Sequence, residues 1–146
     1  MDIKARLTLY VYLEYVNIKK RLHYTGDDMN DSYVDKVLIV EGTSDKRKVK
    51  RIVKEPVEII CTNGTISITK LDELIDFLED KDVYILVDAD AAGEKLRKQF
   101  KREFPEAEHI YIDRAYREVA TAPEHHLATV LLGANIDVHT QFLENC

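Results

Sequence analysis

The alternation of apolar and polar positions from residue 37 onward predicts strands that alternate with helices. Short, almost continuously apolar runs predict buried strands at residues 37–40, 57–61, 83–87 and 109–112. Apolar positions with helical spacing predict helices at residues 44–54, 69–80, 92–104 and 123–134. Such alternation is typical of a parallel sheet with crossover connections. We therefore expect a three-layer α/β fold, with a four-stranded parallel sheet of order 2-1-3-4 flanked by helices.

Polar residues and proline predict where these helices begin. Either Thr43 or Ser44 is expected to cap the first helix. Thr69 and Asp72 form a capping-box pattern at the second helix. Pro123 is expected in the first turn of the last helix.

The first part of the chain differs from the rest. Residues 7–15 alternate weakly between apolar and polar, a basic segment follows, and a polar run precedes Met29. The alternative to an appendage is translated upstream sequence, with the natural start expected at Met29. The length of 146 residues fits one hydrophobic core better than two. We expect residues 1–32 to be an N-terminal appendage, and residues 33–146 to be one domain with a C-terminal helical extension.

Acidic side chains follow two of the predicted strands. Glu41 comes directly after the first strand, and Asp88 and Asp90 follow the third. In the order 2-1-3-4 these strands are neighbours, about 4.8 Å apart, and the winding reverses between them, which is where ligands bind in open α/β sheets. Oxygen ligands without His or Cys suit Mg²⁺, with Mn²⁺ as the alternative ion. The pattern predicts a divalent metal site that also accepts a phosphodiester.

Simpler structural roles are open for several of these residues. Asp90 is equally expected to be an N-cap, and Asp45 to be a first-turn helix acid, with contact to a metal through water as its alternative. The segments 46–54 and 95–102 carry six and five of the 21 Lys and Arg residues. Both segments begin helices at the acidic edge, on opposite faces of the sheet. Their basic side chains are expected either to bind a nucleic-acid backbone or to be merely solvated. The substrate-binding candidates are Gly42, Asp45, Lys46, Asn63, Gly64, Gly93, Lys95, Lys98 and Arg102.

Composition narrows the function classes. The net charge of -6 argues against a protein that coats nucleic acid non-specifically, because such binding depends on neutralising phosphates. No apolar run is long enough to span a bilayer, so a cytoplasmic location is expected. Cys61 and Cys146 are far apart and are expected to be reduced thiols, Cys61 at a buried strand end. His125 and His126 are adjacent in sequence, which favours surface or loop contacts over metal ligation.

Two motifs carry a family resemblance. The sequence VEG at residues 40–42 and the sequence DADAAG at residues 88–93, each after a strand, resemble the Toprim domain of topoisomerases, bacterial primases and certain nucleases. Within residues 36–115 the chain looks most like the ribonuclease family that matures the smallest large-subunit ribosomal RNA. The resemblance implies that Glu41 is a general acid/base and that Asp88 and Asp90 are Mg²⁺ ligands. It also implies that Gly42, Asn63, Gly64 and Gly93 shape the surrounding loops.

Three functions are compatible with these features. The leading hypothesis is Mg²⁺-dependent phosphodiester processing on RNA or DNA by a small stand-alone Toprim protein. The first alternative is a non-catalytic nucleic-acid adaptor, and the second is a receiver-like domain that accepts a phosphoryl group. Nothing resembles a primase zinc ribbon or a topoisomerase domain with a catalytic Tyr. A protein partner could supply substrate specificity, and the sequence leaves the oligomeric state open.

Overall fold

The structure, a computed structural model, describes residues 34–64 and 67–144. Four strands form one parallel sheet in the order β2-β1-β3-β4. They are β1 (Lys36–Val40), β2 (Glu58–Cys61), β3 (Asp82–Leu86) and β4 (Glu108–Ile110). At the centre, Ile39 of β1 pairs with Ile60 on one side and with Ile85 on the other. The predicted sheet and its order are confirmed.

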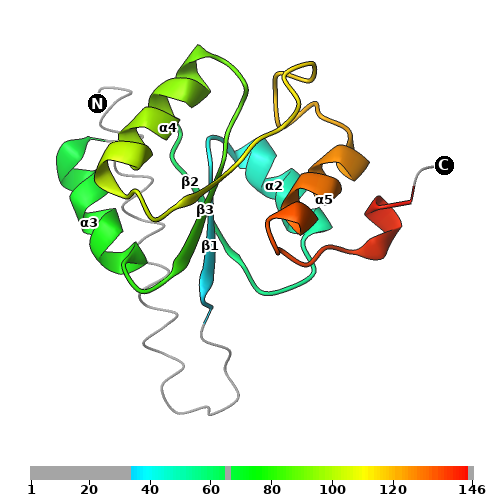
Figure 1. Cartoon of the computed structure of the whole chain (residues 1–146), viewed down its shortest axis with the longest axis horizontal. Coiled ribbons are helices and arrows are strands. Elements are labelled where there is room, and N and C mark those ends of the chain that lie inside the picture. The colour runs from blue at the N-terminus through cyan, green and yellow to red at the C-terminus, as the bar shows by residue number, and fades with distance from the viewer. Residues whose placement is uncertain (1–33, 65–66, 145–146) are drawn as a thin grey trace, which may run out of the picture.

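Helices cover both faces of the sheet, which gives the predicted three layers (Figure 1). On one face lie α2 (Thr43–Ile52) and α5 (Glu124–Gly133), and on the other lie α3 (Ile68–Leu78) and α4 (Ala91–Glu103). The two basic helices, α2 and α4, are therefore on opposite faces, as predicted. A short 3-10 helix, η1 (Thr140–Phe142), follows α5.

The central strands are apolar throughout because both of their faces are buried. Leu38 and Val40 join the hydrophobic cluster under α2 and α5. Val37 and Ile39 join the second cluster, under α3 and α4. Successive side chains of a strand point to opposite faces, so a strand between two helical layers needs an apolar residue at every position.

The helix starts differ from those predicted. Helix α2 begins at Thr43 with Gly42 as its N-cap, so neither Thr43 nor Ser44 is the cap. Helix α3 begins before Thr69, with Ser67 as the N-cap whose hydroxyl accepts from the Lys70 N–H at 3.3 Å, so the expected Thr69 capping box is wrong. Pro123 is the N-cap of α5 and lies just outside its first turn.

One contact in the structure has no counterpart in the sequence prediction, and some predictions concern residues that the structure does not describe. Val53 forms an isolated antiparallel bridge with Val138, which ties the end of α2 to the segment after α5. The predicted appendage at residues 1–32 and Cys146 both lie outside the described residues. None of the helices in the described ranges is long and apolar enough to cross a membrane.

Candidate active site at the carboxyl edge of the sheet

Glu41 and Asp88 meet where β1 and β3 end. Glu41 directly follows β1, and its Oε1 accepts a hydrogen bond from the main-chain N–H of Asp88 at 2.9 Å. Asp88 lies two residues past β3, and its Oδ1 accepts from the Val119 N–H at 2.8 Å. Both side chains are only partly buried. The two predicted acids are thus held at neighbouring strand ends by main-chain amides, and both can reach solvent.

Asp90 serves as the N-cap of α4. Its Oδ1 accepts from the Gly93 N–H at 2.8 Å, the expected geometry for a cap. Gly93 is buried, and a Cβ at this position would lie 2.0 Å from the carbonyl oxygen of Asp88. The first turn of α4 therefore packs directly on the backbone of Asp88, and Gly93 is required for that approach.

Asp45 closes the first turn of α2 against the VEG motif. Its Oδ2 accepts from the Gly42 N–H at 3.0 Å, and the side chain is 6% exposed. With this bond, Gly42 is the N-cap of α2, one residue before Thr43 and two before Ser44. Asp45 is the first-turn helix acid that the sequence predicted, and it lies on the same edge as Glu41.

The turn after β2 borders Glu41 on its other side. The Asn63 N–H donates to the carbonyl oxygen of Glu41 at 2.7 Å. Asn63 and Gly64 both have positive φ, 55° and 111°. Gly adopts such values at little cost and Asn more readily than most residues, which explains the TNG sequence at this turn. Asn63 and Gly64 thus form a turn beside Glu41.

The segment after β4 contributes residues that the sequence did not predict. Besides the bond from Val119 to Asp88, the Ala89 N–H donates to the Arg117 carbonyl oxygen at 2.7 Å. Glu118, between these two contacts, places its charge within range of Asp45 and Asp88. No motif marks this segment, because its position depends on tertiary contacts made far along the chain.

The carboxylates at this edge repel one another. Burial raises the pKa of Glu41, and the charges of Asp88, Asp90 and Asp45 raise it further, against the opposing hydrogen bond from Asp88. Burial also raises the pKa of Asp88, with contributions from Asp90 and Glu118. Asp45 has a raised pKa for the same two reasons. The edge therefore carries negative charge that a cation would neutralise.

The residues fit Mg²⁺ through the chemistry of their donors. Among the described residues, no group of three or more His, Cys, Asp or Glu side chains meets the requirements of a metal site. Mg²⁺, however, typically uses one or two carboxylates and completes its shell with water and substrate phosphate. Within the described ranges, Glu41, Asp88 and Asp90 each use one oxygen for a main-chain amide, and the other oxygen has no hydrogen bond. Those second oxygens are suitable ligands.

The predicted basic residues lie on the two helices α2 and α4. Lys95, Lys98 and Arg102 are exposed on α4, where Arg102 pairs with Glu103 at 2.9 Å. Lys46 is partly buried in the first turn of α2. Arg97, another basic residue of the α4 segment, is 2% exposed and donates to the carbonyl oxygen of Ile110 at 2.7 Å. Part of the basic pattern in α4 is thus structural.

The remaining predicted residues make local contacts. His126 Nε2 accepts from the Asp113 N–H at 2.9 Å, while His125 is exposed, so the predicted loop contact is confirmed for His126. Cys61 is fully buried at the end of β2, and its thiol donates to the Gly42 carbonyl oxygen at 3.3 Å.

Known proteins are similar to this chain in fold and in sequence. The model of the Toprim domain matches residues 36–118, and the chain belongs to the Toprim family. The structure of a small TOPRIM domain protein from Bacillus stearothermophilus has a TM-score of 0.76 and 63% identity, over 79% of this chain and 98% of that one. The uncharacterized protein YusF of Bacillus subtilis is 67% identical over 111 residues, which cover 76% of each chain.

A more distant similarity joins the chain to ribonuclease M5. The enzyme from Fusobacterium nucleatum is 36% identical over 83 residues, which cover 56% of this chain and 44% of that protein. The enzyme from Staphylococcus aureus is 32% identical over 82 residues, again less than half of its length. The similarity thus covers the Toprim region and leaves the larger part of each ribonuclease unmatched. Together with family membership, it supports a role in nucleic-acid processing.

Proposed function

We propose that the protein processes phosphodiester bonds of RNA or DNA in a Mg²⁺-dependent reaction at the edge where Glu41 and Asp88 meet. The observation that carries this proposal is the hydrogen bond from the Asp88 N–H to Glu41 Oε1, which joins the ends of adjacent strands. This bond holds the Glu41 carboxylate against the main chain of Asp88, and the pKa of both carboxyl groups is raised. The Toprim family and the similarity to ribonuclease M5 support the same class of substrate.

The positions of Glu41, Asp88 and Asp90 would give these residues different roles in the reaction. Glu41, whose raised pKa brings its proton exchange closer to neutral pH, would act as general acid or base on a phosphodiester oxygen. Asp88 and Asp90 would hold the metal with their second oxygens, and Glu41 could assist them. Mg²⁺, when bound, would supply positive charge to the phosphate. Mn²⁺ is the alternative ion because it also prefers oxygen ligands.

The first turns of two helices border the reaction centre. Gly42 and Asp45 form the start of α2, and Asp90 and Gly93 form the start of α4. Amide N–H groups at helix starts favour a phosphate nearby. We propose that these turns and the loop of Asn63 and Gly64 surround the substrate, and that the protein acts in the cytoplasm. A partner that selects the substrate is part of the proposal, since the match leaves more than half of each ribonuclease M5 uncovered.

A cleavage assay tests this function. Labelled single- and double-stranded RNA and DNA are incubated with the wild type and with Glu41→Gln, Asp88→Asn and Asp90→Asn, with and without Mg²⁺ or Mn²⁺. Cleavage should require the divalent ion and should fall at least a hundredfold in Glu41→Gln, as expected for loss of a general acid/base. Asp76→Asn, which removes an exposed acid of α3, should retain full activity.

Three results would count against the proposed chemistry. Unchanged cleavage in all three site variants would overturn it. Binding without cleavage by the wild type would favour the non-catalytic adaptor. Stable phosphorylation by a small phosphoryl donor would favour the receiver-like alternative, against which the family match already weighs.

A further inference from the structure

A groove of about 360 Å³ lies between α2 and the N-terminal end of α5. It is lined by Ser44, Arg47, Lys48, Arg51, Ala120 and Glu124. The four α2 residues are spaced i, i+3, i+4 and i+7, so they form one stripe along the helix. Val49 and Ile52 lie on another face of α2 and are buried in the core. The groove therefore has one wall made of a polar, largely basic helix face.

Both walls of the groove begin next to the acidic edge. Ser44 precedes Asp45 in the first turn of α2. Ala120 follows Val119, whose N–H donates to Asp88 Oδ1. A strand of substrate that leaves the Glu41 and Asp88 edge along this face of α2 would enter the groove directly.

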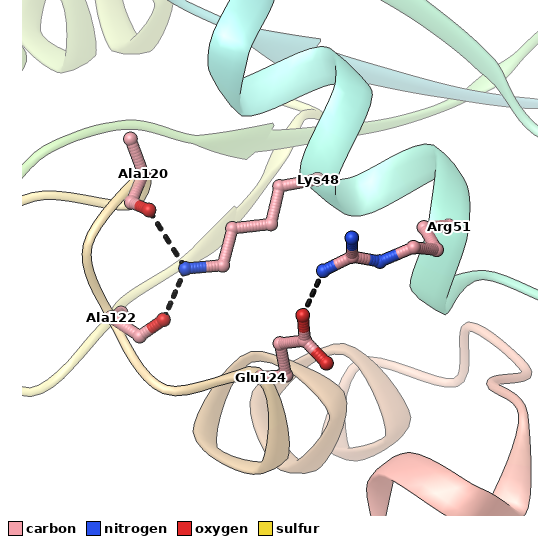
Figure 2. Close-up of polar contacts among 5 residues, drawn as sticks. All are labelled: Lys48, Arg51, Ala120, Ala122 and Glu124. Carbon is pink, nitrogen blue, oxygen red and sulfur yellow. Dashed lines mark hydrogen bonds and ion pairs between the residues drawn. The ribbon is translucent and has the colours of Figure 1, made fainter.

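Lys48 holds the two walls together. Its Nζ donates to the carbonyl oxygen of Ala120 at 2.8 Å and also to that of Ala122, as Figure 2 shows. Neither partner is a carboxylate, so the ammonium charge of Lys48 is not neutralised by these contacts. The groove thus keeps a fixed cation at its base.

The other two cations can turn to a ligand. Arg47 is exposed and has no hydrogen bond or ion pair within the described part of the chain. Arg51 pairs with Glu124 of α5 across the groove (Figure 2), and their side chains are 60% and 41% exposed. Exposed pairs of this kind stabilise proteins little, so Arg51 can exchange its partner. The lining itself holds three cations against one carboxylate, Glu124, so it is positive, and Asp45 near Lys48 offsets part of that charge.

We propose that this groove binds the sugar–phosphate backbone of a nucleic-acid strand that extends from the acidic edge. The inference rests on the proposed function, because it names the path of that substrate. From Ser44 to Arg51 the helix rises about 10 Å, which matches roughly three phosphates of a strand that advances about 3.4 Å per phosphate. Contacts to phosphates carry no sequence information directly, so the groove positions the strand without selecting its bases.

Binding can be measured separately from cleavage. A fluorescein-labelled single-stranded RNA and a DNA of the same sequence are titrated with protein in EDTA, at several salt concentrations. Arg47→Gln should reduce the slope of log K against log salt by about 0.7, which weakens binding roughly fivefold near 0.1 M salt. Glu124→Gln removes the competing carboxylate and should tighten binding by a similar factor.

A matched control lies on the same helix. Lys50→Gln removes one positive charge from an exposed position of α2 that does not line the groove. Its affinity should stay within twofold of the wild type. Thermal melts of the three variants confirm that each remains folded at the assay temperature.

The outcomes separate this inference from the proposed function. Opposite shifts in Arg47→Gln and Glu124→Gln support the groove even if no cleavage is ever seen. Cleavage by the wild type with equal affinities in all variants would overturn the groove and leave the function standing. The inference also fails if the wild type binds no oligonucleotide, or if a nucleoside monophosphate displaces the probe as effectively as an unlabelled strand does.

Discussion

Gly93 decides how closely α4 can approach the backbone of Asp88. A Cβ at this position would lie 2.0 Å from the Asp88 carbonyl oxygen and 3.0 Å from the carbonyl carbon. Both atoms belong to the main chain and cannot move aside as a flexible side chain could. The Gly of the VEG motif behaves differently, since a Cβ at Gly42 would be 3.6 Å from Asp45 Oδ2. The need for Gly is therefore steric at residue 93.

Gly93→Ala should lower the free energy of unfolding by about 1–3 kcal/mol, because the helix must shift away from Asp88. The matched control is Gly133→Ala at the end of α5, where a new Cβ meets no atom within 4 Å. This change should raise stability by roughly 0.5 kcal/mol, because Gly loses more backbone entropy than Ala on folding. Urea unfolding of the three proteins provides the comparison. Equal stability of the Gly93 variant and the wild type would contradict the close packing.

The sequence predicts the acids of the candidate site, but it does not predict the residues that hold the surrounding segments in place. Glu41 and Asp88 stand out because they follow uninterrupted apolar strands. Val119 and Lys48 have no such local signal. Val119 acts through its main-chain N–H, and Lys48 through carbonyl oxygens more than 70 residues away. Contacts made by the backbone of a distant loop leave no pattern in side-chain chemistry.

At the scale of elements, α4 and β4 are joined by a buried cation. Arg97 Nη1 donates to His109 Nδ1 at 3.1 Å, and its guanidinium carbon lies 4.0 Å from the centre of the Tyr111 ring. Since Arg can only donate, His109 Nδ1 is the acceptor and the ring is neutral. Burial and the neighbouring Arg97 charge lower the pKa of His109 from 6.5 to about 4.

This shift predicts a loss of stability in acid. Below pH 6.5 the unfolded chain binds a proton at His109, whereas the folded protein binds it only near pH 4. The free energy of unfolding therefore falls as the pH is lowered from 6.5 to about 4. His109→Asn keeps an acceptor oxygen for Arg97 but cannot titrate. It should therefore show a shallower decline between pH 7 and pH 4 in urea unfolding. The same slope in both proteins would mean that other groups cause the loss.

Helix boundaries show where element-scale prediction fails. The amphipathic spacing of Leu71, Leu74 and Leu78 identified α3 correctly, because all three are buried in one cluster. The capping pattern of Thr69 and Asp72 predicts the wrong start for this helix, because the earlier residue Ser67 is its N-cap. In a chain with several Ser, Thr and Asp residues near a helix start, local chemistry fits more than one cap, and packing selects between them.

For the whole molecule, the alternation of elements predicts a parallel sheet, but it does not predict how the C-terminal part packs. Parallel strands with helical crossovers restrict the sheet to few arrangements, and the order 2-1-3-4 is the one in which strands 2 and 3 lie on either side of strand 1. The packing of α5 against α2 and the bridge from Val53 to Val138 involve no strand pattern. These contacts place the 113–123 segment against the acids, and they build the groove beside them. The candidate site thus depends both on the sheet, which the sequence predicts, and on the contacts of the C-terminal part, which it does not.

The metal site is the central claim for the molecule as a whole, and a thermal titration with Mg²⁺ tests it without any substrate. Asp88→Asn keeps an oxygen for the Val119 N–H but removes one of the repelling charges. Without metal it should melt at the same temperature as the wild type or higher, because the raised pKa of Asp88 means that its ionised form destabilises the fold above the usual Asp pKa. Asp76→Asn in α3 serves as the control for loss of an exposed acid.

Added Mg²⁺ should stabilise the wild type and Asp76→Asn by about 1.4 kcal/mol at ten times Kd, and Asp88→Asn much less. The measurement is the melting temperature of all three proteins across the titration. A wild-type melting temperature that does not respond to millimolar Mg²⁺, or an Asp88→Asn variant that gains as much as the wild type, would contradict the metal site.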